Sequence, residues 1–348
     1  MRIFIDIGHP AHVHYFKNFI KIMEKRNHQF LILARNKDVT HKLLDYYDIN
    51  YVDKGKGSNN LFGKFIYGIY SILKIFRLAI KFKPHLFFSF ASPYAAQAST
   101  ILNKPHITFT DTEHAFTNKG LILFSKIVCT PKSFKRDYGD KHRRFNGFFE
   151  LGYLHPKYFS ADSSVLKKVG IREEEKFIII RFVSWHAGHD FGYKGLDLRV
   201  KVQIIEELSK HVKVYISSED ELPKELIKYQ IKLAPYLIHD FMAFASYFLG
   251  ESGTMTTESA ILGVPSIQVS ALPSGTIGSL EELEHKYGLV KIYENFDKKI
   301  LQDIIRYLNK RDAKKEYLKR RNQMLNETID ITNHMIDLVD EIMDNYEN

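Results

Sequence analysis

Cysteine is almost absent from this 348-residue sequence, and its scarcity excludes two kinds of site. The single residue, Cys129, can form neither a disulfide framework nor a cysteine-based metal site. No stretch reaches about 18 uninterrupted apolar residues, which argues against a membrane-spanning helix. The first residues read as a buried strand and a turn, without the apolar core and cleavage site of a signal peptide. We therefore expect a cytoplasmic protein, at most peripheral to the inner face of a membrane.

Acidic residues are outnumbered, since 50 Lys and Arg face 41 Asp and Glu and leave a net charge of +9. Such a charge favours an anionic partner, for example nucleotide phosphates or acidic lipid headgroups. A generally lysine-rich composition explains it equally well. No nucleic-acid-binding motif occurs, and the aromatic residues are not interleaved with a basic patch. Nucleic acid is therefore not expected as a partner.

Short apolar runs alternate with helical patterns along most of the chain. Strands are predicted at residues 2–7, 29–34, 51–53, 86–90, 106–110, 126–130, 177–182, 212–217, 247–250, 266–269 and 289–292. This alternation implies right-handed βαβ units and parallel sheets. The fold class expected is α/β, with two Rossmann-like, doubly wound domains facing across a cleft, where the carboxyl ends of the strands present a ligand site.

The pattern restarts near Lys176, so the chain is predicted to hold two domains, residues 1–155 and 156–325. Residues 147–159, with Gly152 and Pro156, read as a linker. Residues 326–348 are predicted to form a C-terminal helix able to pack back on the first domain.

The sharpest signal is the stretch Glu251–Pro265, ESGTMTTESAILGVP, which follows a strand and opens a helix. Backbone N–H groups at such a helix start, with Ser252, Gly253 and Thr254 in the loop, make a cradle for a diphosphate. Glu258 lies in the helix, where its carboxylate can accept both hydroxyls of a ribose. The alternative is an ordinary capped helix.

Histidines crowd the loop after the first strand, which reads Gly8-His9-Pro10-Ala11-His12-Val13-His14. Histidine can act as a general base near neutral pH or donate to a phosphate. We take Gly8 and His9 as nucleotide-sugar ligands, His12 as the catalytic base or a transition-state donor, and His14 as facing the acceptor or the sugar. A helix cap or a zinc cluster are the alternatives.

Two further loops follow predicted strands. After the strand at 106–110 come Asp111, Glu113 and His114, of which Glu113 is a second catalytic candidate and the other two would face the acceptor or the sugar. The alternative is a helix cap with a solvated Glu. In the second half, Arg181 ends an apolar strand, so its charge needs a buried anion or a carboxylate. The loop beyond it holds Trp185 and His186, which we assign to the nucleotide-sugar.

These stretches carry a family resemblance that spans most of the chain. The segment at 251–265 is similar to the nucleotide-binding segment of GT-B glycosyltransferases and of non-hydrolysing UDP-N-acetylglucosamine 2-epimerases. Together with residues 6–12 and 181–190, it resembles an uncharacterised GT-B-like family, the domain of unknown function 354. The resemblance implies a diphosphate at Ser252–Thr254, a ribose at Glu258 and a UDP-linked donor. It also implies chemistry without a metal or other cofactor.

A nucleotide-sugar-dependent glycosyltransferase of cell-surface polysaccharide or glycoconjugate biosynthesis is therefore the preferred function. Its partners would be the nucleotide-sugar donor and a glycan or lipid-linked acceptor. A 2-epimerase acting on the same donor, or a nucleotide-sugar-binding protein without turnover, are the alternatives. Residues 62–83 also form a basic amphipathic pattern, which favours contact with an anionic membrane or, alternatively, a core helix.

Overall fold

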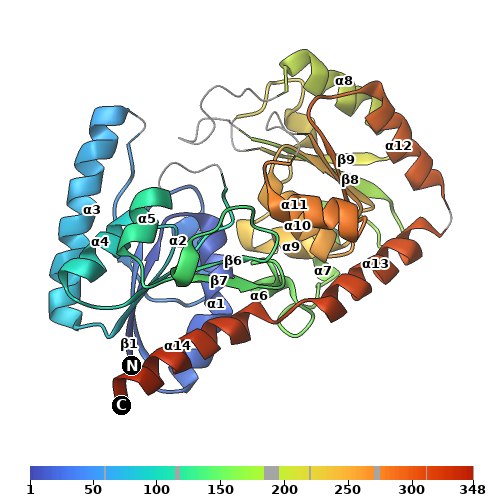
Figure 1. The fold of residues 1–348 in the computed structure, drawn as a ribbon. Helices are drawn as coiled ribbons and strands as arrows, with labels where there is room; N and C mark the ends of the chain where they lie inside the picture. The colour runs from blue at the N-terminus through green and yellow to red at the C-terminus, as the bar shows by residue number, and fades with distance from the viewer. Residues whose placement is uncertain are drawn as a thin grey trace. The chain divides into compact units, whose positions relative to one another are not determined.

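The computed structural model describes residues 1–58, 60–113, 118–183, 196–218, 221–269, 275–310 and 312–347. The chain divides into two compact units, one formed by Met1–Tyr153 with Thr328–Asn348 and the other by Leu154–Glu327 (Figure 1). Each unit contains one parallel sheet, so the predicted α/β class with two Rossmann-like domains is confirmed. No helix in these ranges is both long and apolar enough to cross a membrane.

The sheet of the first unit has seven parallel strands in the order β3-β2-β1-β4-β5-β6-β7. These strands are β1 (Arg2–Ile7), β2 (Gln29–Ala34), β3 (Val52–Asp53), β4 (Leu86–Phe90), β5 (His106–Phe109), β6 (Ile127–Pro131) and β7 (His142–Phe145). All residues of β4, β5 and β6 are buried. These strands are therefore covered on both faces, as is typical of a parallel sheet.

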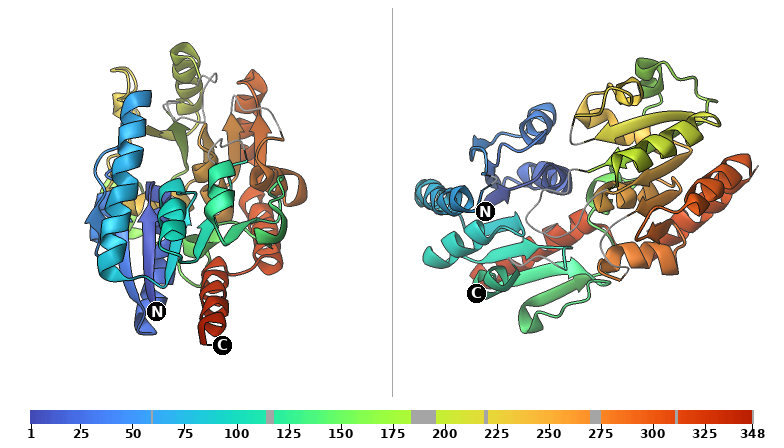
Figure 2. Two further views of the ribbon diagram at one scale, coloured as in Figure 1. Left: turned by 60° about the vertical axis from the view of Figure 1, so that its left-hand side comes forward. Right: turned by 90° about the horizontal axis from the view of Figure 1, so that it is seen from above.

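Helices cover both faces of this sheet (Figures 1 and 2). They are α1 (Pro10–Lys25), α2 (Thr40–Tyr46), α3 (Leu61–Phe82), α4 (Pro93–Ile101), α5 (Asn118–Phe124), η1 (Gly139–Lys141), α6 (Leu151–Leu154) and α14 (Ile331–Glu347). Neighbouring residues of β4 point to opposite faces. Phe87 packs with α3 and α4, whereas Phe88 stacks on Phe19 of α1 at 5.0 Å between ring centroids.

The sheet of the second unit has five parallel strands in the order β12-β11-β10-β8-β9. These strands are β8 (Phe177–Phe182), β9 (Lys213–Ser218), β10 (Tyr247–Gly250), β11 (Ser266–Val269) and β12 (Val290–Tyr293). Alternate residues of β8 again serve two cores, because Ile178 and Ile180 join one cluster while Phe177 and Ile179 join the other.

The helices of the second unit precede, connect and follow its strands. They are α7 (Ser164–Val169), α8 (Leu198–Ser209), η2 (Ile227–Tyr229), η3 (Pro235–Leu237), α9 (Ile238–Ala243), α10 (Gly253–Ile261), α11 (Gly278–Glu281), the π-helical η4 (Glu282–Lys286), α12 (Lys298–Asn309) and α13 (Ala313–Glu327). α8 and α12 cover one face of the sheet, and α7 and α9 the other.

One strand of the first unit differs from the expectations. β7 was not predicted, because its sequence, His142-Arg-Arg-Phe145, carries three polar residues and only Phe145 is buried. The stretch 147–159, predicted as a linker, contains the boundary between the two units, which lies between Tyr153 and Leu154. Its first half is nevertheless packed, since Phe149 and Tyr153 are buried.

Gly152 lets α14 approach the rest of the first unit closely. A Cβ at Gly152 would lie 3.0 Å from Ile331 Cγ2, at the start of α14. The Gly152 carbonyl accepts hydrogen bonds from Asn18 Nδ2 at 2.7 Å and from Thr332 Oγ1 at 3.0 Å. α14 thereby packs against α1 and completes this unit from the far end of the sequence.

Candidate functional site

The loop between β1 and α1 holds Gly8, His9 and His12. His9 caps α1, because its Nδ1 accepts a hydrogen bond from the Ala11 N–H at 3.2 Å. The Gly8 N–H donates to His12 Nδ1 at 3.3 Å. The polar groups of this loop therefore fix one another and the start of the helix, and a ligand would meet a loop that is already ordered.

His12 lies against Phe90 at the end of β4, with 4.8 Å between the ring centroids. Burial and, secondarily, the charge of Lys37 lower the pKa of His12 to about 3, so the ring is neutral at physiological pH. One nitrogen of a neutral imidazole donates and the other accepts. Since Nδ1 faces the Gly8 N–H, Nε2 carries the proton. His12 thus presents a hydrogen-bond donor, which favours the donor role over that of a base.

His14 lies in the core rather than at the loop. Its side chain is 6% exposed, its ring stacks on Tyr153 at 5.1 Å, and the Tyr47 hydroxyl lies 3.4 Å from its Nδ1. His14 is directed away from His12 because residues two apart on a helix do not share a face. Its assignment to the acceptor or sugar side stays a prediction. Across the described ranges no group of three or more His, Cys, Asp or Glu side chains could hold a metal ion.

The loop after β5 carries two carboxyl groups. Burial raises the pKa of Asp111 to about 6, although the hydrogen bond from Thr112 Oγ1 at 3.1 Å acts in the opposite direction. Glu113 is 5% exposed. A carboxyl group that titrates near pH 6 suits proton transfer at neutral pH. Asp111 is therefore the stronger candidate for a base. The predicted ligand His114 lies outside the described residues.

A buried ion pair lies near the carboxyl ends of strands β1 and β3. It was not predicted from the sequence. Asp6 and Lys54 are 1% and 2% exposed, and Lys54 Nζ lies 2.7 and 2.8 Å from the two carboxylate oxygens. Ser92, the N-cap of α4, donates to Asp6 Oδ2 at 2.5 Å. These bonds tie the ends of β1, β3 and β4 together. The signal in the sequence is an aspartate inside an apolar strand.

At the corresponding edge of the second unit, Arg181 lies near the end of β8 and Glu251 follows the neighbouring strand β10. Arg181 is half-buried and its Nη1 donates to Ser217 Oγ at 2.8 Å, so its guanidinium is positioned by the end of β9. Glu251, 4% exposed, accepts hydrogen bonds from the N–H groups of Val183 at 3.2 Å and Leu196 at 2.7 Å. Glu251 thereby joins the end of β8 to the start of α8.

The predicted ligands Trp185 and His186 belong to the segment 184–195, which lies outside the described residues. Val183 and Leu196, which flank this segment, both donate backbone hydrogen bonds to Glu251.

α10 begins where the motif predicted a helix. Ser252 is its N-cap: the side chain accepts from the Met255 N–H at 3.3 Å, and the carbonyl accepts from Thr256 Oγ1 at 2.8 Å. The hydroxyl of Ser252 is thus engaged in the cap. The N–H groups of Gly253 and Thr254 belong to the first turn, which has no intrahelical acceptor for them.

Gln268 of β11 lies beside this helix start and was not singled out from the sequence. A Cβ at Gly253 would meet only Leu280 Cδ1 at 3.5 Å and Gln268 Nε2 at 3.7 Å. Gln268 is 2% exposed, and within the described part of the chain its Oε1 is buried without a hydrogen-bond partner. A buried unpaired carbonyl is costly, which makes a ligand group a fitting partner. The signal is a glutamine in an otherwise apolar strand end.

Glu258 forms a buried pair with His239. Both residues are 4% exposed, and His239 Nε2 lies 2.9 Å from Glu258 Oε1. His239 comes from α9, so this contact couples two helices. It also orients the carboxylate that the sequence assigned to a ribose. The histidine partner could not be predicted, because it lies 19 residues away along the chain.

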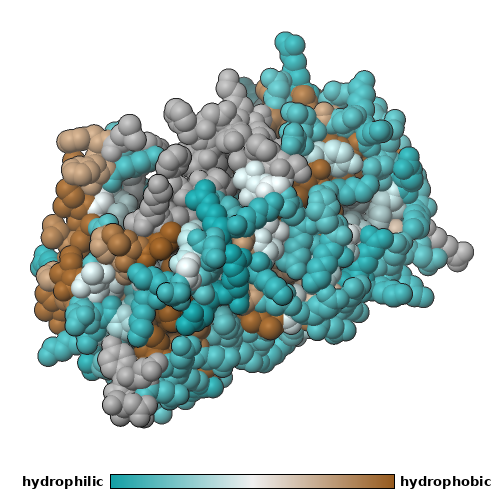
Figure 3. All heavy atoms as spheres, viewed as in Figure 1, coloured by the Kyte–Doolittle hydropathy of each residue, from teal (hydrophilic) through white to brown (hydrophobic). Residues whose placement is uncertain are grey.

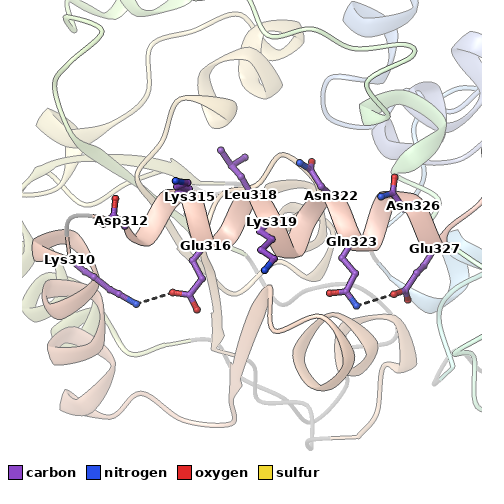
Figure 4. Close-up of a pocket in the computed structure, with 10 residues that line it drawn as sticks. All are labelled: Lys310, Asp312, Lys315, Glu316, Leu318, Lys319, Asn322, Gln323, Asn326 and Glu327. Carbon is purple, nitrogen blue, oxygen red and sulfur yellow. Dashed lines mark hydrogen bonds and ion pairs between the residues drawn. The ribbon is translucent and has the colours of Figure 1, made fainter.

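A broad surface hollow runs along α13 (Figure 4). Two pairs of its lining side chains are in contact, Lys310 with Glu316 at 2.8 Å and Gln323 with Glu327 at 2.9 Å. All of its lining residues come from the stretch 310–327, so it includes no residue from the loops that follow the strands.

Comparison with known proteins places the chain in a wider group. The model of a family described as "Protein of unknown function (DUF354)" matches residues 1–343. An uncharacterized protein of Methanocaldococcus jannaschii, MJ0665, is 28% identical over 325 residues, which cover 89% of this chain and 92% of that protein.

Solved structures show the same fold. UDP-GlcNAc 2-epimerase from Neisseria meningitidis, bound to UDP-GlcNAc, is similar with a TM-score of 0.67, 15% identity and full coverage of both chains. The glycotransferase of kitacinnamycin is similar with a TM-score of 0.66, 9% identity and 98% coverage of both chains. At these identities the likeness concerns the fold alone, which is that of GT-B glycosyltransferases and UDP-GlcNAc 2-epimerases.

Proposed function

We propose, from the premise that this chain belongs to the DUF354 family, that it is a nucleotide-sugar-dependent glycosyltransferase. The observation that carries the proposal is the start of α10, where the N–H groups of the first turn have no intrahelical acceptor and the buried side chain of Gln268, whose Oε1 is unpaired, lies beside Gly253. A cell-surface polysaccharide or glycoconjugate would be the product. The nucleotide-sugar is the donor, and no cofactor is required.

The second unit supplies the groups that suit a nucleotide diphosphate. Helix N-termini attract phosphate through their N–H groups and the helix dipole. Gln268 Oε1 would accept a hydrogen bond from a hydroxyl or amide of the donor held against Gly253. Arg181, positioned by Ser217, would add a positive charge.

Glu258 would meet the ribose. Its carboxylate has about four lone-pair positions. His239 Nε2 lies 2.9 Å from Oε1, and a ribose hydroxyl would donate a further hydrogen bond to the carboxylate. Because the side chain is only 5% exposed, such a hydroxyl would contact one edge of the carboxylate.

The first unit supplies the groups that suit proton transfer to and from an acceptor. The Asp111 carboxylate would take the proton of an acceptor hydroxyl as its oxygen attacks C1 of the sugar. The bond from C1 to the diphosphate breaks, and the nucleoside diphosphate leaves with the bonding electron pair. The Nε2–H of His12 would donate a hydrogen bond to an oxygen atom on which negative charge develops in the transition state. Glu113 remains a candidate for sharing the proton.

A panel of nucleotide-sugars, tested first for protection against thermal unfolding, identifies the donor. Purified protein and that donor are then incubated with glycan or lipid-linked acceptors, and release of nucleoside diphosphate is measured. We expect release only when both donor and acceptor are present. Release that is independent of every acceptor, or absence of any donor binding, would contradict the proposal.

Epimerisation at C2 of the donor is the second candidate, because the fold matches a UDP-GlcNAc 2-epimerase over the full length of both chains. Removal and return of the C2 proton would exchange it with solvent. Incubation with the donor in D2O, without acceptor, therefore separates the two functions. Deuterium at C2 in the NMR spectrum supports the epimerase, and an unlabelled donor supports the transferase.

A further inference from the structure

α3 is a helix with two apolar faces. One face is buried: Ser71, Ile75 and Ala79 recur every fourth residue, and the latter two pack with Phe4 and Phe87 of the sheet. The other face is exposed. It carries seven of the fourteen large apolar side chains that are exposed in the described ranges, namely Phe62, Phe65, Ile66, Ile69, Tyr70, Leu73 and Ile80.

These side chains form a continuous stripe, which we call the α3 stripe. From Phe62 to Leu73 its members recur at intervals of three and four residues, and Ile80 follows two helical turns later on the same face. In Figure 3 the stripe is the brown region at the left, over α3. From Phe62 to Ile80 it extends about 27 Å along the helix. Monomeric proteins rarely expose apolar surface of this extent without a partner.

The charges along α3 are of one sign. Residues 61–83 contain no aspartate or glutamate, and their five basic residues are Lys64, Lys74, Arg77, Lys81 and Lys83. Arg77 and Lys81 are exposed on the C-terminal half of the helix. Lys74 is held by the Tyr70 hydroxyl, which accepts from its Nζ at 2.8 Å. An apolar stripe surrounded only by positive charges is complementary to a surface that has an apolar interior and anionic groups on its outside.

We infer that the α3 stripe docks on the surface of an anionic lipid bilayer. The helix would lie in the plane of the membrane, with its exposed apolar side chains among the acyl chains and its basic side chains at the headgroups. A second copy of the chain fits less well, because an isologous contact would bring the five basic residues of one helix against those of the other. The inference does not depend on the proposed transferase activity.

Co-sedimentation with vesicles tests the inference on the full chain. We expect binding to vesicles of equal parts phosphatidylglycerol and phosphatidylcholine, weak binding to pure phosphatidylcholine, and release as ionic strength rises from about 0.05 to 0.5 M. The double variant Arg77→Gln/Lys81→Gln should bind about 30-fold more weakly, from two lost charges at the surface. The affinity of the variant Phe65→Asn/Leu73→Asn for anionic vesicles should fall at least about tenfold.

Matched controls remove the same kinds of side chain from the second unit. Leu198→Asn/Ile227→Asn removes two exposed apolar side chains, and Lys224→Gln/Lys228→Gln removes two exposed charges. We expect both to bind vesicles like the unmodified protein. No binding to anionic vesicles, or an equal loss in the control variants, would overturn the inference. A dimer in sedimentation velocity that Phe65→Asn/Leu73→Asn dissolves would assign the stripe to a second copy instead.

Discussion

At the residue scale, the pKa values of Asp111 and His12 determine how activity should depend on pH. Burial raises the pKa of Asp111 to about 6, so its carboxylate form, which a base requires, accumulates as pH rises through 6. The pKa of His12, about 3, lies below the working range. We expect kcat/KM to rise about tenfold per pH unit below pH 6 and to level off above it. Steady-state kinetics from pH 4.5 to 8 measure this.

The variant Asp111→Asn should lower turnover by about 100- to 10,000-fold. Asp140→Asn, at an exposed carboxyl of the same unit, serves as control and should leave turnover unchanged. If kcat/KM of Asp111→Asn still rises with pH up to about 6, that pH dependence belongs to a group other than Asp111.

For His12 the structure predicts one tautomer. Nδ1 accepts from the Gly8 N–H, so nitrogen NMR should show the proton on Nε2 and no titration between pH 5 and 8. His12→Ala should lower turnover by about 100- to 1,000-fold through the loss of one donor, with donor affinity nearly unchanged. His12→Gln keeps a side-chain N–H donor and should therefore retain more turnover than His12→Ala. Equal losses in both variants, or a His12 that titrates near pH 6.5, would exclude the donor role.

At the element scale, Glu251 joins β8 to the segment that opens α8. Its two oxygens accept from Val183 and Leu196, and a glutamine offers only one acceptor oxygen. Glu251→Gln should therefore leave one of these partly buried N–H groups unpaired and lower the free energy of unfolding by about 1–3 kcal/mol. Urea denaturation measures the change. Glu225→Gln, at an exposed site in the same unit, should change it by less than about 0.5 kcal/mol.

At the scale of the whole molecule, the two units have separate cores and separate candidate roles. Hydrogen exchange should reveal the division. Addition of the nucleoside diphosphate should slow exchange at the start of α10 and around His239 and Gln268 in the second unit. Backbone N–H groups of the loops after β1 and β5 should keep their rates. Protection confined to those loops of the first unit would contradict the assignment of the diphosphate to α10.

The sequence by itself determined the architecture and the location of the candidate loops. Continuous apolar runs such as Phe177–Ile180 indicate strands of a parallel sheet, because strands covered on both faces have few polar positions. Gly253 and its neighbours marked α10, because glycine and a capping serine act locally. β7 escaped prediction, because its polar residues leave no periodic apolar signal.

Only the tertiary structure decided what the polar side chains contact. His12 and His14 look equivalent in the sequence, yet the helix directs one to the loop and the other into the core. Nothing local pairs Glu258 with His239 or leaves the carbonyl of Gln268 unsatisfied. Desolvation, which raises the pKa of Asp111, likewise depends on all the atoms packed around the group. Strands and helices can be predicted from neighbouring residues in the sequence. The burial and the hydrogen bonds of polar side chains depend on residues that are distant in the sequence and that the fold brings together.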